Sequence, residues 1–190
     1  KDFLQGSENY AVHLALAYKK KPKLGIVLIP ERDELWFGLV GKGAWYENQE
    51  GVKKEVCFSN RRGISKLINV ASKNHQEKIL HNLLRELKFA QTRNIGSVGC
   101  KVATILRGES DVYISLSGKT SPKDWDMAAP HAVIEAAGGA FSHADGRPLT
   151  YEETDYCQRG CLIASHGQSH EIICQKIMCF LSENEPKYMV

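Results

Sequence analysis

The sequence predicts an α/β fold, and a change of hydrophobic pattern along its 190 residues carries this prediction. In the first third, short apolar runs are joined by tight turns, which is the pattern of an antiparallel sheet. After Gly63, strand-like runs alternate with helical runs, which is typical of layered α/β folds with some parallel strand pairing. We therefore expect an antiparallel-sheet domain over residues 1–65 and an α/β domain over residues 66–190.

The antiparallel part begins with a strand at residues 10–18, in which Val12, Leu14 and Leu16 share one face because side chains alternate along a strand. The strand-like runs that follow cover residues 24–30, 34–40 and 44–48, with turns at 31–33 and 41–43. The basic run at residues 19–23 lies between two of these strands, so we interpret it as a solvated hairpin turn rather than a nucleic-acid site.

The α/β part contains three further strands and four helices. The strands are expected at 67–72, 111–116 and 160–165, and three of the helices at 76–88, 127–137 and 169–182. The remaining helix follows the loop "NIGSVG" and ends at Gly108. The helix at 76–88 is amphipathic, because its large apolar residues recur at helical spacing.

The composition is typical of a globular domain, with 43% hydrophobic and 25% charged residues. A net charge of +3 is too small to indicate a nucleic-acid partner. No apolar run reaches the roughly 20 residues that span a bilayer, and no signal peptide opens the chain, so we expect no membrane partner. The six scattered cysteines indicate reduced thiols in a cytoplasmic protein.

One group of cysteines and histidines has the residue types of a zinc site. Only four residues separate the pair Cys157 and Cys161 from the pair His166 and His170. Zinc fingers usually place about a dozen residues there. We therefore do not predict zinc at this position.

The most informative stretch is "KDWDMAAPHAVIEAAGG", residues 123–139, in which Trp125 and Asp126 precede an almost uniformly apolar helix. Asp126 is able to cap this helix, since its carboxylate accepts a backbone N–H and lies at the positive end of the helix dipole. An acidic group at the head of a buried helix is also well placed to hold a hard cation such as Mg²⁺. Gly138 and Gly139 supply the left-handed end of the helix.

"WDMAA" followed by "AGG" resembles the second signature of the inositol monophosphatase superfamily, the Mg²⁺-dependent, lithium-sensitive phosphatases. "GKGAWYEN", "IGS", "SDVYISL" and "DGRPLTY" fall in the order and spacing of that family. The resemblance implies a layered α-β-α-β-α sandwich, a small phosphorylated substrate, Mg²⁺ as cofactor and Asp126 as a metal ligand. It also allows a homodimer.

The chain departs from the family at its start. "KDFLQG" looks like the residues that follow the threonine of the family's first signature, Asp-Pro-Leu-Asp-Gly-Thr. The chain thus resembles only the C-terminal part, without the N-terminal helices and first strands, and residues 1–65 would be the remainder of the N-terminal domain. The resemblance places the catalytic carboxylates upstream and none in this chain, so we expect residues 1–190 alone to be inactive. The reason for this absence and the oligomeric state stay open.

Within the superfamily, the closest resemblance is to the 3′(2′),5′-bisphosphate nucleotidases. These have a similar Lys-Asp/Glu-Phe at the start and a similar Gly-Ser…Lys, here Gly96, Ser97 and Lys101, which would bind substrate phosphate. A helix start offers N–H groups to an anion, although Lys101 alone would be read as a surface lysine. Lys119 stands where inositol monophosphatases carry a glutamate, and an ammonium suits a second phosphate.

Two more positions bear on the substrate. His75, in "ASKNH", matches a histidine that lies against the adenine ring, although an exposed loop histidine is an equal alternative. Ser115 stands where the nucleotidases often have arginine, which weakens the case for a second phosphate. We predict removal of the 3′ phosphate of adenosine 3′,5′-bisphosphate. The alternatives are inositol 1-phosphate or fructose 1,6-bisphosphate hydrolysis, or a non-catalytic anion-binding domain.

Overall fold

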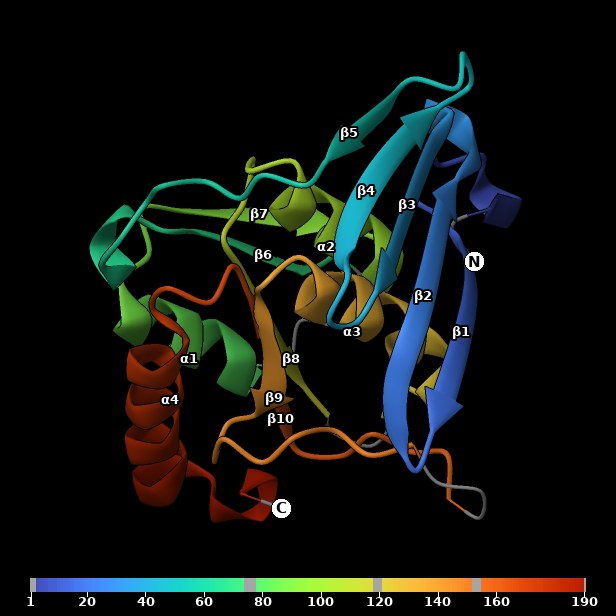
Figure 1. Ribbon diagram of the computed structural model, residues 1–190. Coiled ribbons are helices and arrows are strands. Elements are labelled where there is room, and N and C mark those ends of the chain that lie inside the picture. Colours follow the sequence, from blue (N-terminus) through green and yellow to red (C-terminus); the bar gives the residue numbers. More distant parts are fainter. Residues whose placement is uncertain (1–2, 74–77, 118–120, 152–154, 190) are drawn as a thin grey trace.

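The structure is a computed structural model that describes residues 3–73, 78–117, 121–151 and 155–189. Two five-stranded sheets and four α-helices stack in layers (Figure 1). This arrangement confirms the predicted α/β class. Within the described ranges, no helix has both the length and the apolar character needed to cross a membrane.

The first sheet is the predicted antiparallel meander, with its strands in chain order. Its strands are β1 (Val12–Tyr18), β2 (Lys21–Ile29), β3 (Glu34–Leu39), β4 (Gly43–Asn48) and β5 (Lys53–Glu55). Only the first two residues of the basic run form the β1–β2 hairpin turn: Tyr18 pairs with Lys21, and Lys19 and Lys20 between them both have positive φ. The rest of the run, residues 21–23, belongs to β2, so the turn is shorter than predicted. Two central residues with positive φ match the right-handed twist of the flanking strands.

The second sheet is mixed and has the order β7-β6-β8-β10-β9. Its strands are β6 (Ile68–Ser72), β7 (Gln91–Ile95), β8 (Val112–Leu116), β9 (Ala140–His143) and β10 (Cys161–Ser165). β6 pairs in parallel with β7 and β8, whereas β10 is antiparallel to β8 and β9. The sequence pattern did not predict β7 and β9, because "QTRNI" is mostly polar and "AFSH" is too short to alternate.

The α-helices are α1 (Lys78–Leu87), α2 (Val98–Leu106), α3 (Asp124–Ala136) and α4 (His170–Asn184), and the short 3₁₀ helices are η1 (Phe3–Gln5), η2 (Pro30–Arg32), η3 (Ile64–Lys66) and η4 (Pro186–Tyr188). α2 and α3 lie between the two sheets, while α1 and α4 cover the far face of the second sheet (Figure 1). The layers therefore run sheet, helices, sheet, helices. These layers agree with the predicted layered sandwich.

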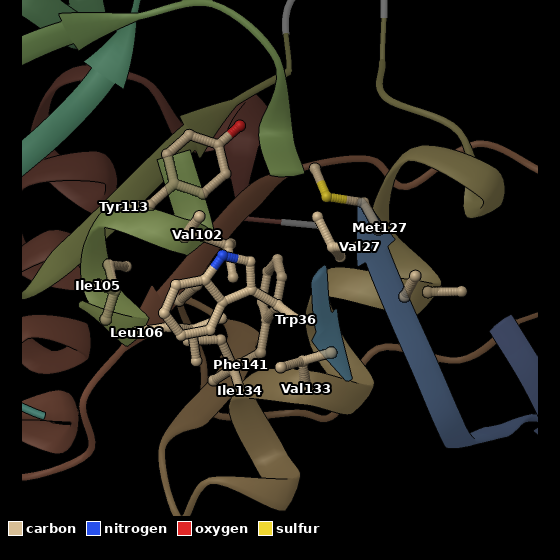
Figure 2. Packing of buried hydrophobic residues seen from close by; sticks show 14 of the residues in the cluster. Val27, Trp36, Val102, Ile105, Leu106, Tyr113, Met127, Val133, Ile134 and Phe141 are labelled. Carbon is tan, nitrogen blue, oxygen red and sulfur yellow. The ribbon is translucent and has the colours of Figure 1, made fainter. Parts of the chain in front are cut away.

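The space between the sheets is filled by apolar side chains from both sheets and from the two helices between them. Figure 2 shows Trp36 of β3 packed with Ile105 and Leu106 of α2 and with Val133 and Ile134 of α3. All five are buried. A second apolar cluster joins α1 and α4 to the outer face of the second sheet. The two helical layers thus have separate cores, one on each side of the second sheet.

α3 begins at Asp124, three residues earlier than the predicted start of 127. The expectation that Asp126 precedes the helix is therefore wrong, because the turn starting at Lys123 already has helical hydrogen bonds: the Asp126 N–H donates to the Lys123 carbonyl over 2.9 Å. At the other end, Gly138 has φ +85°, as predicted for a left-handed helix end. A Cβ at Gly139 would lie 2.6 Å from the Ser165 carbonyl oxygen, so the second glycine allows β10 to approach.

α3 lies unusually close to the first sheet, because glycines on two neighbouring strands face it. A Cβ at Gly25 of β2 would lie 2.3 Å from the carbonyl oxygen of Ala129 and 2.8 Å from the Cβ of Ala132. A Cβ at Gly38 of β3 would lie 2.8 Å from the Cβ of Ala136. Helix backbone and strand backbone are therefore in near-direct contact.

The opposite face of the first sheet is apolar and exposed. Val12, Leu14, Leu16 and Tyr18 project from β1 with exposed fractions of 56%, 62%, 59% and 60%. The predicted shared face of Val12, Leu14 and Leu16 is thus present, and it points away from α3.

Replacing Gly25 by alanine tests the close packing of α3. The added methyl group would overlap the backbone of Ala129, and overpacking of this kind typically costs about 1–3 kcal/mol. For a chain of this size we expect Tm to fall by several degrees, roughly 2–4 °C per kcal/mol, in thermal unfolding followed by circular dichroism. Val12→Ile also adds one carbon, on the exposed face, and should leave Tm nearly unchanged. Equal effects of the two substitutions would show that the contact is not tight.

Candidate functional site

Asp126 lies in the first turn of α3, where a carboxylate interacts favourably with the positive end of the helix dipole. Its Oδ2 accepts the backbone N–H of Lys123 over 2.9 Å. The side chain is half-buried, so one end of the carboxylate is fixed while the group stays within reach of a ligand. Asp126 is thus a capping residue and also a candidate cation ligand, and these two roles do not exclude each other.

The carbonyl of Asp126 is released from the helix by a proline. Pro130 stands four residues later and has no N–H to donate to that carbonyl. The ring of His13, on β1, lies here instead: its Nδ1 is 3.4 Å from the Trp125 carbonyl oxygen, and it also hydrogen-bonds the Asp126 backbone. Burial lowers the pKa of His13, and the Asp126 charge acts in the opposite direction.

His13 also contacts the start of α2. A Cβ at Gly99 would lie 2.3 Å from His13 Nε2, so only glycine fits beside the imidazole. His13 therefore lies between the first turns of α2 and α3. The N–H groups of a first helical turn have no partner within the helix and carry partial positive charge. At α3 this charge is already met by the carboxylates of Asp124 and Asp126 in its first turn, so the start of α2 is the setting that favours an added anion.

Gly96 and Ser97 connect the carboxyl end of β7 to α2, the strand–turn–helix arrangement that binds phosphate in many α/β proteins. Ser97 is the N-terminal flanking residue of α2 and has φ +50° and ψ 136°. Residues other than glycine rarely adopt this conformation. Strain of this kind costs about 1–3 kcal/mol and is found preferentially at functional sites.

Lys101 is 3% exposed, which removes the reading of it as a surface lysine. Its Nζ lies 5.0 Å from the ring centroid of Tyr113 on β8, within the range of a cation–π interaction. Lysine is almost never fully buried without a partner for its charge. A buried ammonium one helical turn after Ser97 supplies the positive charge that an anion site needs.

Tyr113 connects this lysine to Asp126. Burial, opposed by a hydrogen bond with Ser115 and aided by the Asp126 charge, raises the pKa of Tyr113 to about 12. The phenol is therefore neutral at physiological pH, close to a cation on one side and a carboxylate on the other. The structure thus gathers Asp126, Lys101 and the α2 start into one region.

Two of the predicted substrate-binding residues, His75 and Lys119, lie outside the described residues. The sequence analysis did not identify two residues that the structure places at the site, His13 and Tyr113. His13 could have been noticed, because it is the polar residue on the inward-facing side of β1, opposite to Val12 and Leu14. Tyr113 gave no signal, since a tyrosine in an apolar strand is an ordinary core residue.

The described residues supply one candidate metal ligand but not a complete site. Across the four described ranges, no group of three or more histidine, cysteine, aspartate or glutamate residues is arranged to hold a metal ion. The carboxylate of Asp126 has the hard oxygen atoms that Mg²⁺ prefers. It fits a divalent cation as one ligand of a set whose other members this part of the chain does not provide.

A profile of the inositol monophosphatase family matches residues 1–180. The chain is 33% identical over 151 residues to the 3′(2′),5′-bisphosphate nucleotidase CysQ of Escherichia coli strain K12, covering 80% of this chain and 58% of that protein. It is 23% identical over 154 residues to the inositol-1-monophosphatase of Bacillus subtilis strain 168, covering 80% of this chain and 56% of that protein. The chain therefore spans a little over half the length of these curated relatives.

The fold is also similar to that of solved structures of this family. The solved structure of CysQ from Bacteroides thetaiotaomicron, a bacterial member of the inositol monophosphatase family, matches with a TM-score of 0.74 at 25% identity. The match covers 87% of this chain and 66% of that chain.

Replacing Ser97 by glycine tests whether strain is stored at the start of α2. Glycine adopts positive φ without penalty but loses more entropy on folding, so we expect a net stabilisation of about 1 kcal/mol. The measurement is the free energy of unfolding in urea. Ser97→Ala removes the hydroxyl and keeps the Cβ, so this control should bring no stabilisation. If alanine raised the free energy of unfolding as much as glycine does, the hydroxyl group and not the backbone conformation would be the source of the instability.

Proposed function

Because this chain belongs to the inositol monophosphatase family, we propose that the whole protein is a divalent-metal-dependent phosphatase. Its substrate in this proposal is adenosine 3′,5′-bisphosphate, a nucleotide of sulfur assimilation, from which it removes the 3′ phosphate. The observation that carries the proposal is the buried Lys101 beside the helix start at Ser97, close to the carboxylate of Asp126. An anion site next to a candidate cation ligand is what phosphate ester hydrolysis requires.

Gly96, Ser97 and Lys101 hold the phosphate in this proposal. The N–H groups of the first α2 turn and the Ser97 hydroxyl are hydrogen-bond donors, and the Lys101 ammonium supplies the charge. Tyr113 keeps the ammonium in place through its ring and excludes water from it, since both side chains are buried. Lys101 is therefore held in position before an anion binds.

Asp126 holds a divalent cation, which we propose to be Mg²⁺, together with ligands outside the described residues. When bound, such a cation lowers the pKa of a water molecule and stabilises the leaving oxygen. The contribution of the chain is to fix the carboxylate: Lys123 N–H binds Oδ2, and His13 holds the adjoining backbone. Lithium sensitivity belongs to the same proposal.

The nucleotide assignment is supported by the 33% identity to a bisphosphate nucleotidase. His75 against the base and Lys119 on the second phosphate complete the proposal. Ser115 weakens it, because this side chain is engaged with Tyr113 and replaces an arginine. That position favours inositol 1-phosphate as the second candidate. The six free thiols fit a reducing compartment, so a cytoplasmic location is proposed as well.

Asp126→Asn tests the metal role. Asparagine keeps an oxygen that accepts the Lys123 N–H, so the helix start should survive, but the charge that attracts the cation is lost. In the whole protein we expect kcat to fall by about 100-fold or more, since metal activation supplies several kcal/mol. Tm should change little. Asp124→Asn is the matched control, because Asp124 is a buried carboxylate of the same turn bonded to Gln158 Nε2 over 2.7 Å.

The control variant should keep its kcat, because asparagine still accepts the Gln158 N–H and position 124 holds no cation in this proposal. If Asp126→Asn instead lowers Tm and leaves kcat intact, Asp126 is only a helix cap.

The substrate assignment is tested by phosphate release from adenosine 3′,5′-bisphosphate and from inositol 1-phosphate. We expect at least a tenfold preference for the nucleotide in kcat/KM, about 1.4 kcal/mol of transition-state discrimination. Lys101→Met keeps the length of the side chain and removes its charge, so it should reduce the preference. Lys66→Met, at an exposed position, should not. Equal efficiencies for the two substrates would reject the nucleotidase assignment and leave a general phosphatase.

A further inference from the structure

Residues 155–158 lie across the start of α3 and are called the strap below. A β-bridge pairs Lys123 with Cys157. The Asp124 N–H donates to the Tyr156 carbonyl over 2.8 Å, and the Gln158 N–H donates to the Pro122 carbonyl over 2.8 Å. These bonds hold the strap directly against the turn that carries Asp126.

Within this contact, the Nζ of Lys123 lies 2.7 Å from the Sγ of Cys157. That distance is at the short end of the range for N–H···O hydrogen bonds, although sulfur is a larger atom than oxygen. This N–S distance is too long for a direct nitrogen–sulfur bond. It matches the separation expected when nitrogen and sulfur are both bonded to one atom between them. Cys157 is partly exposed, so a small oxidant can reach the sulfur.

The Cys157 thiol has one more polar neighbour. Its backbone N–H donates to Asp155 Oδ1 over 3.1 Å, and its side chain also hydrogen-bonds this carboxylate. Asp155 is itself paired with Arg159 over 2.5 Å. The sulfur therefore lies between an ammonium and a carboxylate, with its position set by three hydrogen bonds.

We propose that Lys123 and Cys157 form a covalent nitrogen–oxygen–sulfur bridge when the protein meets a peroxide. The first step converts the thiol to a sulfenic acid: Cys–SH + H₂O₂ → Cys–SOH + H₂O. Plain condensation of a sulfenic acid with a nitrogen atom expels this oxygen as water and gives an S–N link, so a bridge that keeps the oxygen needs a second oxidant. The second step is Cys–SOH + Lys–NH₃⁺ + H₂O₂ → Cys–S–O–NH–Lys + 2 H₂O + H⁺. Here the second peroxide takes two electrons as its O–O bond breaks and the N–O bond forms.

The other cysteines lack this arrangement. Cys100, Cys161 and Cys174 are buried, and burial raises the pKa of each of these thiols. Cys57 and Cys179 are exposed, but neither has a described lysine partner: Cys57 Sγ donates to the Phe58 carbonyl over 3.8 Å, and Cys179 Sγ donates to the Glu183 carboxylate over 3.8 Å. Exposure to peroxide should therefore produce one intramolecular bridge, at Cys157.

The bridge would fix the strap to α3 by a covalent bond. Lys123 is also the residue whose backbone N–H holds the Asp126 carboxylate. The link would thus limit movement of the turn that carries Asp126. This inference rests on the geometry of the pair and holds whether or not the protein is a phosphatase.

The test is mass spectrometry of the whole purified protein after treatment with hydrogen peroxide. We expect a species heavier by one oxygen and lighter by two hydrogens, which dithiothreitol converts back to the starting mass. Trypsin cleaves after unmodified lysine, so the bridged form should remain uncut after Lys123 and yield one peptide joined to the peptide of Cys157.

Two variants and one control identify the partners. Lys123→Arg keeps a cation and Cys157→Ser keeps a small polar group, and both should abolish the joined peptide. Cys179→Ser removes an exposed cysteine elsewhere and should leave it unchanged. Oxidation of Cys157 to sulfinic or sulfonic acid with Lys123 free would overturn the proposal, and so would a link lacking the oxygen. The result on the unmodified sequence decides the matter even if a variant fails to fold.

Discussion

The near-contact of α3 with the first sheet is the constraint on which the rest of the structure depends. Gly25 and Gly38 leave no side chain between strand and helix, and alanines at positions 129, 132 and 136 leave almost none on the helix side. The opposite side of α3 carries Met127 and Ile134, which fill the space toward the second sheet. The helix therefore contacts strand backbone on one side and large side chains on the other. Because both contacts are close-packed, the position of its first turn is fixed.

That fixed turn allows unfavourable local features to be combined at the site. Pro130 gives up a helical hydrogen bond, Ser97 adopts a backbone conformation that favours glycine, and Lys101 carries a buried charge. Each is unfavourable by itself and persists because the surrounding packing determines it. Features that lower stability are expected to cluster at functional sites, and these three lie together near the starts of α2 and α3.

Other buried polar groups show what a purely structural role looks like. Asp111 is fully buried and accepts hydrogen bonds from Ser59, from Arg61 Nε over 2.7 Å and from the Ile68 N–H over 2.7 Å. His131 is a buried residue of α3 that is bonded to Tyr151 over 2.8 Å and paired with Glu135. These groups are saturated by protein partners. Asp126, half-buried and bonded through one oxygen to a backbone N–H, has capacity left for a ligand.

The sequence by itself determined the class of fold, the antiparallel meander and the stretch that carries Asp126, because hydrophobic period and turn residues are local properties. The division into domains at residues 65 and 66 stays a prediction. Tertiary structure alone decided that "QTRNI" is a strand, since its pairing with β6 overrides a polar sequence. It also decided that Lys101 is buried, that His13 joins two helix starts and that Lys123 meets Cys157. These facts depend on contacts between residues up to 112 positions apart, as for His13 and Trp125, and no local pattern encodes them.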